Sequence, residues 1–119
     1  MTTTALSIGE KLVGYCKEGK EDICLKELYA ENAHSIEPDG TTAKNIDEIR
    51  GKHQWWAENF EVHSGQVTGP FPHGDRFAVI FDMDTTNKQS QQRSQMKEVG
   101  LYTVEQGKIV KEEFFYAPE

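Results

Sequence analysis

The spacing of apolar residues changes once along this chain, near residue 61. Before that point apolar residues recur every three or four positions, which is typical of helices, and after it they alternate, which is typical of strands. The predicted order is helix, helix, strand, helix and then four strands. These elements are expected over residues 7–18, 21–31, 33–38, 45–60, 62–71, 76–86, 95–105 and 108–117.

Polar residues at the expected element ends support this division. Ser7 with Glu10, and Asn45 with Glu48, have the three-residue separation of a helix capping box. Residues 106–107, Gln-Gly, are typical of a tight turn between two antiparallel strands. The last two strands should therefore form a hairpin.

The same spacing predicts which side chains face the core. On the helices these are Ile8, Leu12, Tyr15, Cys16, Ile23, Cys24, Leu28, Ile46, Ile49, His53, Trp56 and Phe60. On the last three strands they are Phe77, Val79, Phe81, Met83, Lys97, Val99, Leu101, Thr103, Val110, Glu112, Phe114 and Tyr116. A slip of the last strand by one residue turns Glu113 inward in place of Glu112, because alternate side chains change face.

The other face of the sheet carries apolar residues that a monomer would leave in water. We expect a homodimer through this convex face, with acidic residues at its rim. The apolar positions are Ala78, Ile80, Gly100, Tyr102 and Phe115, and the acidic positions are Asp82, Asp84, Glu98 and Glu113.

Helices followed by an antiparallel meander are typical of the α+β class, with the helices packed on one face of the sheet. Long strands twist and curl, and a curled sheet closed by helices leaves a conical cavity. The chain has 119 residues, which is the length of one domain, and no linker interrupts residues 1–119. We therefore expect a single domain with an internal pocket.

Composition narrows the classes of partner. The chain carries 13 Lys+Arg and 20 Asp+Glu, for a formal net charge of −7. An acidic domain repels phosphate backbones and anionic lipid, so the expected partner is neither nucleic acid nor membrane. The N-terminus has no basic region followed by an apolar run, so we expect no signal peptide and a cytoplasmic location.

Cofactor and metal motifs are missing from the sequence. Cys16 and Cys24 lack Cys-x-x-Cys spacing and are interpreted as reduced thiols in the core. The residues His34, His63 and His73 lack the spacing of metal ligands. Because the chain also has no phosphate loop and no dinucleotide fingerprint, we expect neither a cofactor nor a metal.

Four segments together resemble the SnoaL-like polyketide-cyclase family, within the nuclear transport factor two and ketosteroid isomerase superfamily. They are residues 28–38, 46–56, 67–70 and 107–116, and they extend over nearly the whole chain in order. The resemblance implies a cystatin-like cone with the element order α-α-β-α-β-β-β-β. It also implies pairing of two sheets back to back, and it leaves the reaction open, because one fold hosts many activities.

In ketosteroid isomerases the general base is a carboxylate before a proline at the end of the first strand, and Glu37-Pro38 matches that position. A carboxylate in an apolar cone is desolvated, which raises its pKa and makes it a useful base near neutral pH. The two groups that bind the enolate oxygen in those isomerases fall near Leu12 and Val99, which cannot donate a hydrogen bond. This departure from the isomerase pattern argues against a steroid isomerase that uses those two groups.

The resemblance and the predicted faces together give the candidate site. Either Glu37 or Glu112, or both, would move a proton, and His53 is a secondary candidate. The ligand wall is expected to contain Tyr15, Trp56, Phe60, Phe81, Met83, Val99, Phe114 and Tyr116. The predicted function is binding of a small hydrophobic ligand, with cofactor-free cyclase, isomerase or hydrolase chemistry. The alternative is a non-catalytic binding module or a dimeric interaction module.

Overall fold

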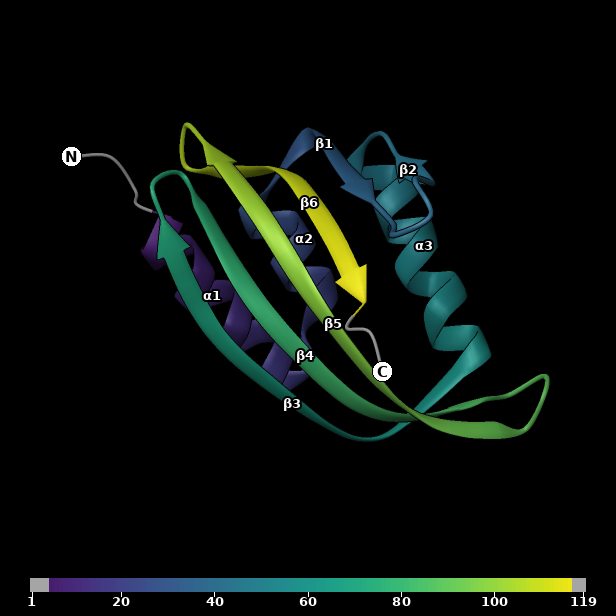
Figure 1. The fold of residues 1–119 in the computed structure, drawn as a ribbon. Helices are drawn as coiled ribbons and strands as arrows, with labels where there is room; N and C mark the ends of the chain where they lie inside the picture. Colours follow the sequence, from purple (N-terminus) through teal and green to yellow (C-terminus); the bar gives the residue numbers. More distant parts are fainter. Residues whose placement is uncertain (1–4, 117–119) are drawn as a thin grey trace.

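The computed structural model describes residues 5–116, which form three helices and six strands (Figure 1). No helix in this part of the chain is long and apolar enough to cross a membrane. In chain order the elements are α1 Ala5–Glu18, α2 Glu21–Leu28, β1 Tyr29–Ile36, β2 Thr42–Ala43, α3 Ile46–Asn59, β3 Phe60–His73, β4 Arg76–Asn87, β5 Gln92–Glu105 and β6 Lys108–Tyr116.

The predicted order of elements is confirmed, and the differences lie at their ends. The second helix stops at Leu28, before its predicted end, because Tyr29 already pairs with Ile109 of β6. Pairing with a distant strand thus overrides the local preference for helix. A two-residue strand, β2, was not predicted and pairs with the end of β1. Residue 117, the predicted end of the last strand, lies outside the described residues.

Two predictions about the helices were wrong and one is confirmed. The side chain of Asn45 accepts a hydrogen bond of 2.9 Å from the backbone N–H of Glu48, as expected of a cap. Ser7 lies inside α1 and so does not cap it. Ile23 is 43% exposed, because the short α2 turns its neighbours Cys24, Leu25 and Leu28 towards the core instead.

All six strands belong to one sheet, in the order β2-β1-β6-β5-β4-β3. The strands β1 and β6 are parallel, and every other neighbouring pair is antiparallel. The sheet curves, and in Figure 1 helices α1 and α2 lie behind its long strands, whereas α3 lies at the right beside β1 and β2. The fold is therefore α+β with a mixed sheet, in which the antiparallel meander from β3 to β6 matches the prediction.

The core lies between the helices and the concave face of the sheet. Phe77 of β4 stacks on Tyr102 of β5, with ring centroids 4.9 Å apart, and both are almost fully buried. Helix α1 packs closely on the sheet at Gly9, where a Cβ atom would lie 2.6 Å from Cβ of Pro70. The other fully buried apolar residues include Leu12, Leu25, Ile49, Val79 and Ile109.

The predicted face of β4 is confirmed, and so are Glu112 and Phe114 of β6, but Val110 was wrongly predicted to face the core, where Ile109 lies instead. The face predicted for β5 is wrong. Tyr102 pairs with Phe77 and with Glu112, and these side chains are buried. Val99 pairs with Ile80 and Phe115, which are exposed on the convex face. Lys97, Val99, Leu101 and Thr103 therefore face outward, whereas Glu98, Gly100, Tyr102 and Val104 face the helices.

A β-bulge at Val110 causes this difference. After the tight turn, Val104 pairs with Ile109, but the next residue, Thr103, pairs with Lys111. Val110 is thus an extra residue in β6. Beyond it, every residue of β6 is shifted by one position against β5, so that Glu112 lies opposite Tyr102. A regular hairpin from the same turn would have placed Leu101 opposite Glu112, which is the register that the sequence suggested.

Substitution of Gly9 by alanine should destabilise the protein, because the new methyl group meets the Pro70 ring and Phe77. We expect Gly9→Ala to lower the free energy of unfolding by about 1–3 kcal/mol. Gly14→Ala, in the same helix, is the matched control, since nothing lies within 4 Å of the added Cβ. Higher helix propensity should make that control up to about 1 kcal/mol more stable. Equal effects of the two substitutions in urea denaturation would contradict the packing described.

Candidate functional site

The carboxylate of Glu112 is buried where β1 meets β6, and its side chain is paired on both oxygens. Only 1% of the residue is exposed. The hydroxyl of Tyr29 donates to Oε1, and the hydroxyl of Ser35 donates to Oε2 at 2.6 Å. A buried charge needs such donors to offset its lost hydration. Glu112 therefore lies too deep, and is too fully bonded, to contact a ligand directly.

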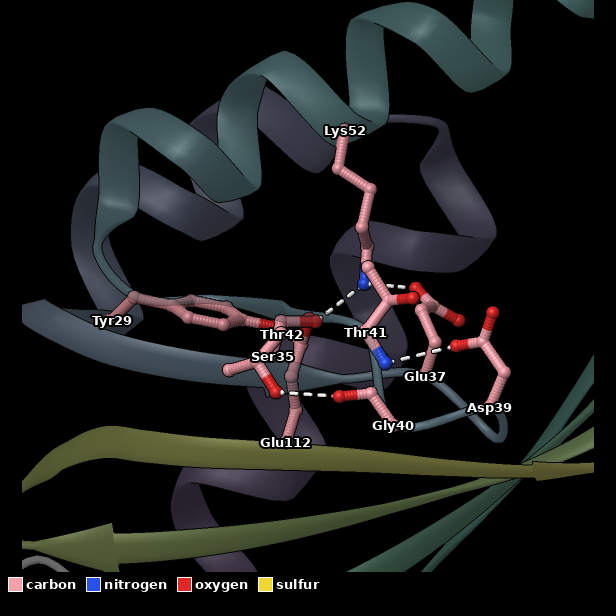
Figure 2. Close-up of polar contacts among 9 residues, drawn as sticks. All are labelled: Tyr29, Ser35, Glu37, Asp39, Gly40, Thr41, Thr42, Lys52 and Glu112. Atoms are coloured by element: carbon pink, nitrogen blue, oxygen red, sulfur yellow. Dashed lines mark hydrogen bonds and ion pairs between the residues drawn. The ribbon is translucent and has the colours of Figure 1, made fainter.

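Lys52 connects this buried group to Glu37. It extends from α3 towards the sheet, and its Nζ donates to the hydroxyl of Ser35 and forms an ion pair with Oε1 of Glu37 (Figure 2). The same Nζ lies 4.8 Å from the ring centroid of Phe114, in a cation–π contact. A chain of polar contacts thus runs from the core, through Ser35 and Lys52, to Glu37 at the end of β1.

An open pocket of about 440 Å³ lies beside Glu37, where this series of polar contacts ends. It forms where β1 ends at Ile36 and β6 continues without a neighbour on that side. Its lining residues are Ile36, Glu37, Pro38, Gly40, Glu113, Phe114, Phe115 and Tyr116. A second open pocket, of about 630 Å³, lies near the β5–β6 turn, but none of the converging polar residues lines it.

Glu98 is the functional candidate that the sequence analysis missed. It lies on the concave face, directly across from Tyr116 on β6 and from Phe81 on β4. Burial, and next the nearby carboxylate of Glu37, raise the pKa of Glu98 from its ordinary 4.5 to about 7, although Lys52 acts in the opposite direction. No hydrogen bond or ion pair holds its carboxyl group within residues 5–116.

The hairpin between β4 and β5 contains the signal that identifies Glu98. Asn87 pairs with Gln92, so the turn comprises only residues 88–91. Counting back from a four-residue turn places Phe81 opposite Glu98 and Phe77 opposite Tyr102. The sequence analysis ended one strand at residue 86, began the next at residue 95 and did not use their pairing to choose the inward face of the second strand.

The structure brings together only part of the predicted ligand wall. Phe114 and Tyr116 line the pocket beside Glu37. Phe81 and Met83 lie further along the same concave face, and Trp56 stacks on Phe60 with ring centroids 5.2 Å apart. Val99 is on the convex face, and the hydroxyl of Tyr15 donates to Glu27 of α2, away from the pocket. The predicted position of Val99 is therefore wrong, whereas a ligand contact of Tyr15 stays a prediction.

His53 faces inward from α3, but no hydrogen bond joins it to Glu37 or Glu112. Its Nδ1 is buried without a partner in the described part of the chain. Burial is the main cause that lowers its pKa, so the imidazole is neutral at pH 7. Cys16 and Cys24 are free, and burial raises the pKa of the Cys16 thiol to about 12. Among residues 5–116, no three His, Cys, Asp or Glu side chains are placed to hold a metal ion together.

The arrangement can therefore bind a small molecule and exchange a proton with it. Glu98 changes its charge near neutral pH, as a general acid or base must. Glu37 lines the pocket, and the ion pair holds the ammonium group of Lys52 against it. Phe114 and Tyr116 supply apolar surface beside these groups.

Comparison with known proteins identifies the family and confirms the fold. The model of the SnoaL-like domain matches residues 1–116. A crystal structure from Mesorhizobium loti is 38% identical and has a TM-score of 0.91, over 96% of this chain and 100% of that one. Its name reads SnoaL-like polyketide cyclase, with carbohydrate phosphatase in brackets. No curated protein matches the sequence significantly.

More distant solved structures share the fold. An NTF2-like protein from Burkholderia thailandensis is 18% identical with a TM-score of 0.83, over 97% of this chain and 92% of that one. A protein from Catenulispora acidiphila with a ketosteroid isomerase-like fold, solved in complex with trimethylamine, is 18% identical with a TM-score of 0.74. That match covers 97% of this chain and 88% of the other. At these identities the matches establish the fold alone.

The raised pKa of Glu98 predicts a pH dependence of stability. Because the folded protein holds this proton more tightly than the unfolded chain, stability should fall as pH rises from about 4.5 to about 7 and then level off. The contribution is up to about 3 kcal/mol. Glu98→Gln, which stays neutral, should remove it.

Urea denaturation of both proteins between pH 4 and pH 8 measures this difference. Every other group is the same in the two proteins, so the difference between the two curves isolates Glu98. Parallel curves would show that the folded state leaves the pKa of Glu98 unchanged.

Proposed function

Because this chain belongs to the SnoaL-like domain family, we propose that it is a cofactor-independent acid–base enzyme acting on a small, hydrophobic carbonyl compound. The compound binds in the open pocket beside Glu37, Phe114 and Tyr116. Glu98 takes or returns a proton at the carbon next to the carbonyl group. Such a step underlies both isomerisation and ring closure by aldol chemistry.

One observation carries this proposal: an unpaired carboxyl group with a pKa near 7 faces the concave side beside the pocket. A general base works best when its pKa lies near the working pH, because it is then both ionised and basic. Perturbed carboxyl groups of this kind are concentrated at functional sites. Glu98 combines the perturbation with a position across from Tyr116, which lines the pocket.

The three carboxyl groups have different roles in this proposal. Glu37, the base suggested by the family resemblance, is engaged by Lys52, so it serves mainly to hold the ammonium group and to orient the ligand. Glu112 is a positioning residue, because it contacts Ser35 and Tyr29 rather than the pocket. Glu98 is left as the group that is free to accept a proton.

The relatives support a small-molecule site in this fold. The Mesorhizobium loti protein is named after cyclases of polyketides, which are carbonyl-rich compounds. The Catenulispora acidiphila protein was solved with a small molecule, trimethylamine. The pocket volume of about 440 Å³ lies in the range usual for small-ligand sites.

Exchange of deuterium into a flat ketone tests the proposal. With 2-tetralone in D₂O, the protein should accelerate exchange at the carbon next to the carbonyl, as followed by NMR. The rate should rise through about pH 7 and then level off, since the ionised form of Glu98 is the base. Glu98→Gln should lower the rate by on the order of 10²-fold or more.

Glu105→Gln is the matched control, because Glu105 is an exposed glutamate on the same strand. Equal exchange rates for the wild type and Glu98→Gln would refute the acid–base role. Binding of 2-tetralone, seen by ligand-observed NMR, without any exchange would instead favour the alternative, a non-catalytic binding module.

We also propose that two copies pair through the convex face of the sheet. Ile80, Val99 and Phe115 form an apolar row across β4, β5 and β6, and Ile80 and Phe115 are 40% and 48% exposed. Ion pairs between Asp84 and Arg93 and between Lys111 and Glu113 lie on the same face. A self-complementary contact needs both signs of charge at its rim, and this face supplies them.

A charge placed in the apolar row should separate the two copies. We expect the wild type to sediment as a dimer and Ile80→Glu as a monomer, because the contact would bury an unpaired carboxylate. Ile23→Glu, at a similarly exposed position on α2, should leave the dimer intact. A wild type that sediments as a monomer would refute this pairing.

A further inference from the structure

We infer that Lys52 is a nucleophile that forms an iminium with the carbonyl group of a neutral aldehyde or ketone bound in the open pocket. This inference rests on the proposed function and adds a covalent step to it. It also names the substrate class more narrowly, as an uncharged carbonyl compound with a hydrogen on the adjacent carbon.

The placement of the amine supports this role. A surface lysine ordinarily keeps its ammonium group in water, on a flexible stem. The side chain of Lys52 is only 26% exposed, and its Nζ is held by Glu37, Ser35 and the ring of Phe114. Ordering a lysine in this way costs side-chain entropy, which the three contacts must offset. The amine is thereby fixed against two residues, Glu37 and Phe114, that line the pocket.

The neighbouring carboxyl groups can carry the protons that the reaction needs. Glu37 takes one proton from the ammonium group, and the neutral amine attacks the carbonyl carbon to form a C–N bond. The carbonyl oxygen takes up a proton from nitrogen and a second one from Glu37, and then leaves as water. The balance is R–NH₃⁺ plus a carbonyl compound giving the iminium plus water, with no change of net charge and no oxidant or reductant.

The charge of the product matches the environment of the starting lysine. An iminium is a cation, like the ammonium that it replaces, so the carboxylate of Glu37 and the face of the Phe114 ring stabilise it as well. The positive charge also acidifies the adjacent carbon, where Glu98 can remove a proton. With Glu37 and Glu98 beside one lysine, the site disfavours anionic substrates such as keto acids.

Trapping with a reductant tests the inference on the intact chain. The protein is treated with limiting butanal and sodium cyanoborohydride, and peptide mapping by mass spectrometry gives the alkylation rate of each lysine. We expect Lys52 to be alkylated about tenfold faster than Lys44, an exposed lysine just before α3. A lysine that only balances charge would react more slowly than Lys44, because it is less exposed and is engaged in an ion pair.

The alkylation rates of Lys52 and Lys44 are compared in the wild-type protein, so the result does not require a variant that folds. Alkylation of Lys52 no faster than that of Lys44 would overturn the inference. Lys52→Arg, which keeps the positive charge but cannot form an iminium, should also lose the 2-tetralone exchange.

The two proposals fail in different ways. Exchange that persists in Lys52→Arg, without trapping at Lys52 in the wild type, would remove the covalent step and leave the role of Glu98 standing. Exchange that persists in Glu98→Gln would remove the proposed function even if Lys52 were trapped.

Discussion

The position of the buried Glu112 carboxylate organises this structure. The parallel pairing of β1 and β6 brings Ser35 beside Glu112, and Tyr29 donates from the start of β1. Removal of one partner from a buried charged network typically costs about 3–5 kcal/mol, because the remaining groups stay buried and unpaired. The network therefore fixes how β1, β6 and, through Lys52, helix α3 lie relative to one another. That arrangement also determines the shape of the pocket at the end of β1.

The same network explains why three glutamates in one region behave differently. Glu112 has two hydroxyl donors, Glu37 has an ammonium partner, and Glu98 has neither. Desolvation acts on a carboxyl group most strongly where no donor compensates it. The pKa near 7 thus belongs to Glu98, whose neighbours include the charge of Glu37. Glu98 is the proposed proton-transfer group because its carboxyl group has no hydrogen-bond or ion-pair partner among the described residues. A glutamate in the sequence does not by itself reveal whether it has such a partner.

Local patterns were enough to predict the fold class, the element order, the inward face of β4 and the end of β6 that carries Glu112 and Phe114. Asn45 as a helix cap and Glu112 as an inward acid also followed from spacing. Neither the exposure of Ile23 nor the early end of α2 could be read from spacing, because both depend on contacts with distant elements. The site was harder to predict: the identification of Glu98 required the register of two hairpins, and the role of Lys52 required the approach of α3 to β1 and β6.

The bulge at Val110 has a consequence for how such a site can change. With β5 fixed by β4, a regular β5–β6 hairpin would direct Lys111, Glu113 and Phe115 towards the helices and turn Glu112 out to solvent. One residue of strand length thus decides which of two complete sets of side chains faces the interior. Gain or loss of a single codon near this turn would exchange the whole lining of β6 at once, whereas point substitutions alter it one position at a time. Single-residue insertions and deletions near this hairpin therefore offer a route by which chains of this fold could diverge in chemistry while keeping the same helices and strands.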